Sequence, residues 1–182
     1  MKKVVVNDTN VFIDLFNVGL LDEFFSLPWE VHTTDLVMLE LQREGQQATV
    51  SKFQDTGQLH IPTLAPMEVA NIASLYQLHS NRTNLSLTDC SVWYYAKTNH
   101  YMLLTGDRKL RTVAIFDDVE VHGIIHVFDT LVECGVISLE VAIEKLQLLY
   151  DTNPRLPKDE KDKRLALWKS ELAKKGENEK SR

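Results

Sequence analysis

The sequence has only two cysteines among its 182 residues, and neither stands in a CxxC pair or at a zinc-ligand spacing with histidine. A disulfide framework needs several paired cysteines, and a structural zinc site needs four Cys or His ligands. The sequence therefore predicts neither kind of cross-link. We expect Cys90 and Cys134 to be small residues of the core.

Long apolar runs are also missing, since no segment approaches the roughly 20 apolar residues that span a bilayer. At the N-terminus, Met1-Lys2-Lys3 is followed by only three valines, too short an apolar region for a secretory signal. We therefore expect a cytoplasmic protein with no membrane partner. With 44% hydrophobic residues, the chain can still bury the core of one domain.

Positive charge is scarce in the first 150 residues. Ten of the 20 Lys and Arg residues, but only seven of the 26 Asp and Glu residues, lie in residues 151–182. The first 150 residues therefore carry a formal charge near −9, and the tail carries one near +3. Proteins that bind nucleic acid over a broad surface use clustered Lys and Arg, so any such contact here must be local or metal-mediated.

Short apolar runs alternate with segments of helical spacing along the first 150 residues. We expect strands over residues 4–7, 31–33, 59–61, 101–104 and 119–121. We expect helices over residues 10–25 with a break near Gly19, 35–44, from 66 to a polar break at 79–84, 86–98, from 108 onward, 124–135 and 138–150. This alternation predicts an α/β fold with a parallel sheet covered on both faces.

Residues 151–182 differ from the rest in their density of charge. Leu165, Trp168 and Leu172 give this segment one narrow apolar stripe at helical spacing. We expect a domain over residues 1–150 and a charged helical extension over 151–182 that ends in disorder. The stripe is too sparse to bury itself, so the helix should pack on the domain or on a second subunit.

Two aspartates directly follow predicted strands. Asp8 comes after the valine-rich run at the N-terminus, and Asp107 follows the strand over 101–104 in the turn Thr105-Gly106-Asp107. In open parallel sheets, ligands gather outside the carboxyl ends of the strands. Either residue could instead simply cap the helix that follows it.

Two further acids lie within apolar helical stripes. Helical projection places Glu40 between Leu36 and Val37, where a charged residue needs a partner, although a partly exposed glutamate would also fit the position. Asp89 begins a buried stripe with Val92 and Trp93, and it completes the capping box Ser86-Leu87-Thr88-Asp89. Its alternative role is that of a first-turn acid favoured by the helix dipole.

Four converging carboxylates would repel one another unless a cation lay between them. Oxygen ligands without accompanying His or Cys are typical of magnesium or manganese sites. A calcium site is the alternative, but the EF-hand spacing is absent. The acids therefore predict a Mg²⁺ or Mn²⁺ site with room for a phosphate.

The stretches that carry these acids resemble the motifs of the PIN-domain nucleases, which include the ribonuclease toxins of bacterial toxin–antitoxin pairs. They are VVVNDTNVFID, VMLELQRE, LSLTDCSVWYYAK and LLTGDRKLRTVA, in the family's order over about residues 3–150. Each motif is short, but four in order make a fairly specific signal. The resemblance implies a three-layer sandwich with a central parallel sheet of about five strands and helices on both faces.

The resemblance also implies a site and an activity. The acidic quartet of the family corresponds to Asp8, Glu40, Asp89 and Asp107 as catalytic and metal-binding residues. Asn10 and Thr105 correspond to polar helpers that orient the carboxylates. The implied reaction is metal-dependent hydrolysis of RNA phosphodiester bonds with one or two ions of Mg²⁺ or Mn²⁺. An antitoxin protein and a second copy of the chain are the partners it suggests, and Asp14 is expected to be structural.

A dense basic patch stands beside Asp107. Arg108, Lys109 and Arg111 could bring in the nucleic-acid backbone, although a solvated helix face would show the same pattern.

Other functions stay open at this point. An aspartyl-phosphate phosphatase would place an Asp after the first strand, but it would need a second Asp where Asn10 stands. A PIN fold used as a binding or scaffold module without turnover is a stronger alternative, and a metal-dependent cleavage assay would separate it from a nuclease. Within the nuclease reading, the residues do not distinguish a toxin from a housekeeping RNA-processing enzyme.

Overall fold

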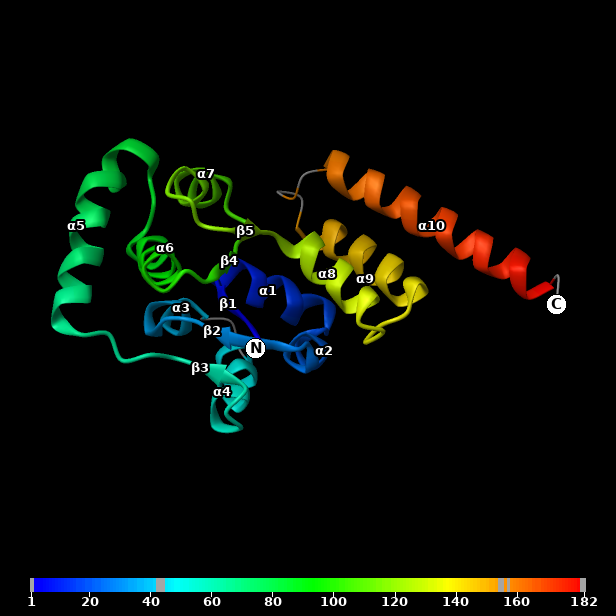
Figure 1. The fold of residues 1–182 in the computed structure, drawn as a ribbon, viewed down its shortest axis with the longest axis horizontal. Helices are drawn as coiled ribbons and strands as arrows, with labels where there is room; N and C mark the ends of the chain where they lie inside the picture. Colours follow the sequence, from blue (N-terminus) through cyan, green and yellow to red (C-terminus); the bar gives the residue numbers. More distant parts are fainter. Residues whose placement is uncertain (1, 42–44, 154–155, 157, 181–182) are drawn as a thin grey trace.

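The computed structural model describes residues 2–41, 45–153, 156 and 158–180. Its centre is one sheet of parallel strands in the order β3-β2-β1-β4-β5 (Figure 1). The strands are β1 (Lys3–Asn7), β2 (Trp29–His32), β3 (Leu59–His60), β4 (Met102–Leu104) and β5 (Val121–His122). All five lie within or next to the runs that the sequence indicated, and the predicted parallel α/β fold is confirmed.

Helices connect the strands and cover the sheet. Their bounds are α1 (Thr9–Val18), α2 (Leu21–Ser26), α3 (Asp35–Glu40), α4 (Gln46–Asp55), α5 (Pro66–Thr83), α6 (Leu87–Asn99), α7 (Arg108–Phe116), α8 (Ile124–Glu133), α9 (Leu139–Thr152) and α10 (Lys158–Lys180). The break near Gly19 separates α1 from α2, because Gly19 takes a left-handed conformation with φ of 67°. Over the described residues, no helix combines the length and hydrophobicity that a membrane span requires.

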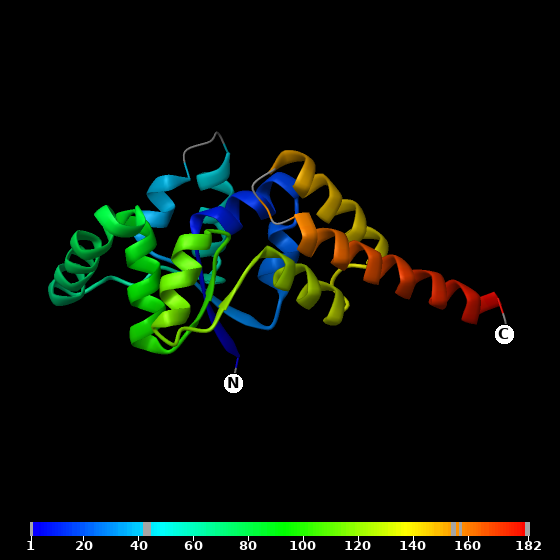
Figure 2. The same ribbon diagram turned by 90° about the horizontal axis from the view of Figure 1, so that it is seen from above.

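The helices form layers on the two faces of the sheet. On one face α6 packs on β1 and β4, with α5 outside it, and on the other α1, α2, α8 and α9 gather (Figures 1 and 2). The chain winds outward from β1 to β2 and β3, then returns to the centre and continues through β4 to β5. The sequence order of the strands therefore reverses between β1 and β4, and such a switch point is where open α/β sheets bind ligands.

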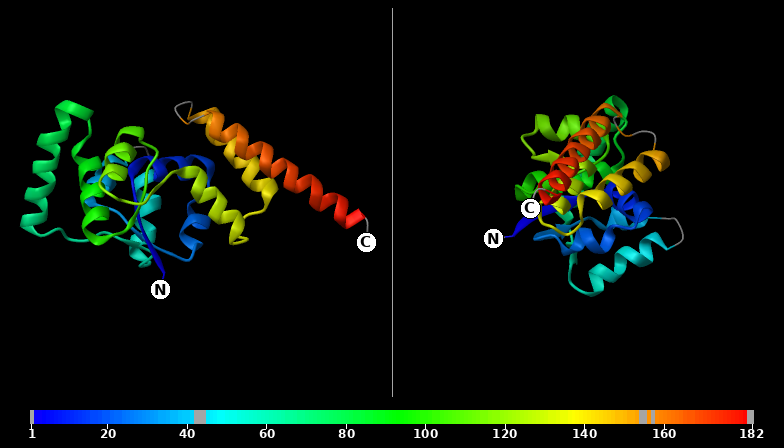
Figure 3. Two further views of the ribbon diagram at one scale, coloured as in Figure 1. Left: turned by 45° about the horizontal axis from the view of Figure 1, so that its top comes forward. Right: turned by 90° about the vertical axis from the view of Figure 1, so that its right-hand side faces the viewer.

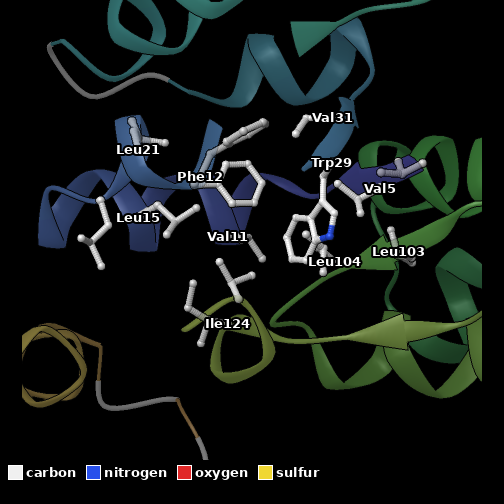
Figure 4. Close-up of a cluster of buried hydrophobic side chains, with 14 of the residues drawn as sticks. Val5, Val11, Phe12, Leu15, Leu21, Trp29, Val31, Leu103, Leu104 and Ile124 are labelled. Atoms are coloured by element: carbon white, nitrogen blue, oxygen red, sulfur yellow. The ribbon is translucent and has the colours of Figure 1, made fainter. Parts of the chain in front are cut away.

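The core between α1 and the sheet holds α1 in position behind Asp8. Figure 4 shows Phe12 and Leu15 of α1 gathered with Trp29 of β2 and Ile124 of α8. Phe12 and Leu15 are fully buried, and Phe12 makes an edge contact with Phe24 at 6.4 Å between ring centroids. Helix α1, which starts directly after Asp8, is thus anchored along its apolar face.

The C-terminal helix packs on the rest of the chain, as the apolar stripe predicted. Helix α10 runs beside α9 and continues beyond it (Figure 3). Leu165 and Trp168 are buried, and Trp168 lies 6.4 Å from Phe128 of α8 between ring centroids. The expected disordered end stays a prediction, because α10 continues to Lys180 and residues 181–182 lie outside the described residues.

Four details differ from the sequence prediction. The helix expected over residues 35–44 ends at Glu40, and residues 42–44 lie outside the described residues. Helix α4 has no counterpart in the prediction, because only Gln46, Val50 and Phe53 of its ten residues are buried. The polar break expected at 79–84 is wrong, since α5 continues to Thr83 and ends at left-handed Asn84. Cys134 is exposed rather than part of the core.

Candidate active site

The site begins where β1 ends. Asp8 follows the last strand residue and is 1% exposed. Its Oδ1 accepts a hydrogen bond from the Thr9 backbone N–H at 2.8 Å, at the start of α1. Its Oδ2 accepts from the Thr105 hydroxyl at 2.7 Å and from the Asn10 amide at 3.2 Å. Asp8 is therefore both a helix cap and a buried carboxylate held by three neutral donors.

Burial raises the pKa of the Asp8 carboxyl from 3.8 to about 7. The hydrogen bonds from Thr105, Thr9 and Asn10 lower the pKa, but they do not offset the loss of hydration, and the negative charge of Asp89 raises it further. A carboxyl with this pKa is only partly ionised at neutral pH. A nearby cation would stabilise the ionised form.

The end of β4 supplies the second part of the site. Thr105 is fully buried, and its hydroxyl both donates to Asp8 and accepts from the Asp107 backbone N–H at 3.0 Å. Asp107 Oδ1 in turn accepts from the backbone N–H groups of Lys109 at 2.7 Å and Leu110 at 2.8 Å, which caps α7. One threonine side chain thus joins the two turns that follow β1 and β4.

Helix α6 brings the third aspartate. The predicted capping box is present, because Asp89 Oδ2 accepts from the Ser86 N–H at 2.7 Å and Ser86 Oγ accepts from the Asp89 N–H at 3.0 Å. Burial raises the pKa of Asp89, the Ser86 hydrogen bonds oppose the rise, and the charges of Asp107 and Glu40 add to it. These interactions place Asp89 within electrostatic range of both acids.

Glu40 is the last residue of α3, and it is exposed rather than enclosed by the apolar stripe. The helical projection was wrong on burial because α3 is a single short segment that buries only Val37 and Met38. The partner that the projection called for nevertheless exists: Glu40 Oε2 accepts from the Thr9 hydroxyl at 2.7 Å. Glu40 is therefore tied to the turn after β1.

The four acids thus come from four separate segments, and Asp89 interacts electrostatically with the other three. The alternative readings of the three aspartates are also correct, because Asp8 and Asp107 cap α1 and α7, and Asp89 is an acid of the first turn of α6. The two roles do not exclude each other. A carboxylate has two oxygens and accepts several hydrogen bonds or ligands at once.

The donor set fits a hard divalent cation in its chemistry, since it consists of carboxylate and hydroxyl oxygens. The crowding of like charge around Asp8 and Asp89 also favours a bound cation. As the side chains lie, however, no group of three or more His, Cys, Asp or Glu residues in the described part of the chain could hold a metal ion. Metal binding would therefore require some carboxylates to turn from their present hydrogen bonds.

The three basic residues after Asp107 do not share one environment. Arg108 and Lys109 are exposed. Arg111 is half-buried, and its guanidinium donates long hydrogen bonds to the backbone carbonyls of Thr105 at 3.4 Å and Val121 at 3.5 Å. Its charge is thus directed at the strand ends, while Arg108 and Lys109 face solvent.

Two residues of the site lacked a separate assignment in the sequence. Thr9 touches both Asp8 and Glu40, and only its place directly after Asp8 could have indicated this. Asn7 is fully buried beside Asp8, and its side-chain oxygen has no hydrogen-bond partner among the described residues. Asp14 lies deeper in α1, where burial raises its pKa to about 6 and Asn153 donates to it at 2.9 Å.

Comparison with known proteins gives one family and several distant structures. A family model described as a PIN domain matches residues 4–170, twenty residues beyond the stretch that carries the four motifs. No curated protein matches the chain closely enough to count as a relative.

Three solved structures are similar to parts of this chain. The crystal structure of PAE2754 from Pyrobaculum aerophilum has 15% identity and a TM-score of 0.49, covering 75% of this chain and 100% of its own. VapBC2 from Rickettsia felis, bound to a promoter DNA fragment, has 13% identity and a TM-score of 0.45, covering 66% of this chain and 98% of its own. FitAcB from Neisseria gonorrhoeae has 17% identity and a TM-score of 0.42, covering 67% of this chain and 99% of its own. Similarity at this level establishes no function.

Proposed function

The chain belongs to the PIN-domain family, and on that premise we propose that it is a magnesium- or manganese-dependent endoribonuclease. Members of this family are generally nucleases that use divalent metals. The observation that supports the proposal is the electrostatic interaction of Asp89 with Asp107 and Glu40 and with Asp8, which is buried among neutral donors at the end of β1. The site is thus locally rich in negative charge, and among the described residues no Lys or Arg forms an ion pair with any of the four acids.

Each residue has a proposed role in hydrolysis of an RNA phosphodiester bond. Asp8, Glu40, Asp89 and Asp107 would hold the metal. When bound, the cation would activate a water molecule and stabilise negative charge on the phosphate and the leaving oxygen. Thr105 and Asn10 keep the Asp8 carboxylate in one orientation through their hydrogen bonds.

Binding of the RNA backbone is proposed for the basic residues that follow Asp107. Arg108 and Lys109 are exposed at the start of α7, next to the acid cluster, so their positive charge can attract phosphate groups. Arg111 supports the site from the inside, through the carbonyl of Thr105. A local contact of this kind agrees with the low positive charge of the first 150 residues.

The partners are proposed on the motif resemblance alone. RNA is the proposed substrate, and we extend the proposal to an antitoxin protein and to a homodimer. A small DNA-binding protein encoded beside this chain would support the toxin role if its co-expression relieves growth arrest caused by this protein. Mass measurement of the purified chain in solution tests the dimer.

A cleavage assay tests the enzymatic proposal. The purified protein should cut RNA internally when Mn²⁺ or Mg²⁺ is present and should stop when a chelator is in excess. Asp8→Asn should reduce the rate by more than about a hundredfold, because loss of a ligand should exceed the 10–100-fold effect of losing a ligand's hydrogen-bond partner.

The matched control is Asp22→Asn, which makes the same charge change in the first turn of α2, outside the acid cluster. It should retain full activity, and both variants should keep the far-ultraviolet circular dichroism of the wild type. Cleavage that persists in Asp8→Asn or in excess chelator would defeat the proposal. Absence of cleavage in the wild type under all metal conditions would favour a binding or scaffold module.

A further inference from the structure

Thr9 is the one residue that contacts both Asp8 and Glu40 through hydrogen bonds in the described structure. Its backbone N–H donates to Asp8 Oδ1 at 2.8 Å, and its hydroxyl donates to Glu40 Oε2 at 2.7 Å. Its own position is fixed, since it is 6% exposed and is the first residue of α1. A single buried residue therefore links the Asp8 carboxylate, which follows β1, to the Glu40 carboxylate at the end of α3.

Glu40 needs such a link because nothing else described holds its carboxylate. It ends the six-residue helix α3, and both Glu40 and the preceding Leu39 are exposed, so packing does not select one side-chain orientation. Glutamate has several rotatable bonds, and restricting them costs rotamer entropy. The bond from Thr9 is the only hydrogen bond that the Glu40 carboxylate accepts within the described residues.

The place of Thr9 in the helix leaves its hydroxyl available for this task. In the middle of a helix, a threonine hydroxyl commonly bonds the backbone carbonyl one turn earlier. Thr112 does so within α7, where its hydroxyl donates to the Arg108 carbonyl at 2.8 Å. Thr9 is the first helical residue, so no earlier turn of α1 competes for its hydroxyl. Its branched Cβ also restricts χ1.

We propose that Thr9 is a positioning residue that holds the Glu40 carboxylate toward Asp8 and Asp89. The proposal rests on the proposed metal-dependent function. Thr9 touches neither substrate nor reacting atoms and acts through Glu40. The Coulombic contribution of Glu40 to Asp89 agrees with this orientation, since the two carboxylates lie within electrostatic range.

The test compares Thr9→Val, which keeps the shape and removes the hydroxyl, with Thr9→Ser, which keeps the hydroxyl. Calorimetric titration with Mn²⁺ gives metal affinity without turnover, and a cleavage assay gives kcat and KM. Thr9→Val should bind Mn²⁺ about 10-fold more weakly and lose kcat to a similar extent, with KM for RNA unchanged. Thr9→Ser should recover most of the affinity.

A double-mutant cycle with Glu40→Ala separates positioning from a general structural effect. If Thr9 acts through Glu40, Thr9→Val should cause no further loss of Mn²⁺ affinity in the Glu40→Ala background. Thr112→Val is the matched control, because it removes an exposed threonine hydroxyl that bonds only within its own helix. It should leave Mn²⁺ affinity and kcat unchanged.

The outcomes distinguish this inference from the proposed function. A wild type that neither binds Mn²⁺ nor cleaves RNA overturns the proposed function, and the role of Thr9 falls with it. A wild type that binds and cleaves, with Thr9→Val indistinguishable from it, overturns the role of Thr9 alone. Equal losses from Thr9→Val with and without Glu40, or failure of both Thr9→Val and Thr9→Ala to fold, would assign Thr9 to stability instead.

Discussion

The carboxylates of the acid cluster and the carboxylate at the contact between α8 and α10 have different kinds of partner. Around Asp8, the carboxylates receive hydrogen bonds from hydroxyl, amide and backbone groups, and none of the four acids forms an ion pair with a described Lys or Arg. At the other end, Asp129 of α8 pairs with Arg164 of α10 at 3.0 Å, beside the buried ring of Trp168. The first arrangement leaves charge available for a ligand, whereas the second uses it to dock a helix.

The largest effect on stability is expected at the docked helix. Trp168 is 3% exposed, so Trp168→Ala should lower the free energy of unfolding by about 3–5 kcal/mol. RNA cleavage below the melting temperature should be unchanged, because Trp168 lies outside the acid cluster. Leu167→Ala on the same helix is the control, since Leu167 is 46% exposed and should cost little. Equal melting temperatures for wild type and Trp168→Ala would mean that α10 contributes no packing energy in solution.

The next effect concerns the pH dependence of the acid cluster. The pKa of Asp8 rises from 3.8 to about 7 on folding, so between these pH values the folded state keeps a proton that the unfolded state loses. Stability of the metal-free protein should therefore fall as pH rises from about 4 to about 7, by up to about 4 kcal/mol. Asp8→Asn should lose less stability over this range, because only the contributions of Asp14, Asp89 and Asp129, whose pKa values are also raised, remain.

Denaturant unfolding at several pH values in chelator measures the difference. Asp22→Asn, in which an exposed acid is neutralised, should follow the wild-type curve. Parallel stability curves for wild type and Asp8→Asn would show that burial does not shift the Asp8 pKa.

Metal binding should restore part of the stability that the wild type loses as pH rises. Mn²⁺ at about a hundred times its dissociation constant should stabilise the wild type by about 2.7 kcal/mol. Asp107→Asn should gain much less, while its metal-free stability should be unchanged or higher, because Asn also caps a helix well. Thermal melts with and without Mn²⁺ give both quantities, and Asp35→Asn serves as the control. Equal shifts in wild type and Asp107→Asn would reduce Asp107 to a helix cap.

The smallest effect is expected at the Asp129–Arg164 pair. Burial raises the pKa of Asp129 to about 6, although Arg164 lowers it, so Asp129 is ionised at pH 8 and largely neutral at pH 5. Arg164→Gln should cost about 1 kcal/mol at pH 8 and less at pH 5, because a neutral Asp129 does not need the positive charge. Lys163→Gln, which changes an exposed neighbour, should have no such pH dependence. A larger cost at pH 5 than at pH 8 would contradict the pairing.

The prediction from sequence was most accurate where local chemistry fixes the backbone. The capping box at Ser86 and Asp89 and the end of the first helix at Gly19 appear in the structure as expected. Each depends on residues only a few positions apart. It failed at α4, whose polar residues leave only a weak apolar face, and at the end of α5, where the polar run 79–84 stays helical up to Thr83. Contacts with neighbouring helices decide such segments.

For this protein the sequence alone determined the alternation of short strands and helices, the position of each acid within its motif, and the stripe by which α10 packs. Only the tertiary structure decided that strand order reverses between β1 and β4, that Thr105 joins their two turns, and that Thr9 reaches Glu40 on α3. Capping and periodicity act over a few residues, so they can be read along the chain. The Thr9–Glu40 bond joins residues that are 31 positions apart in the sequence, and the Thr105–Asp8 bond joins residues that are 97 positions apart. Such bonds form only after long-range strand pairing has brought the segments together.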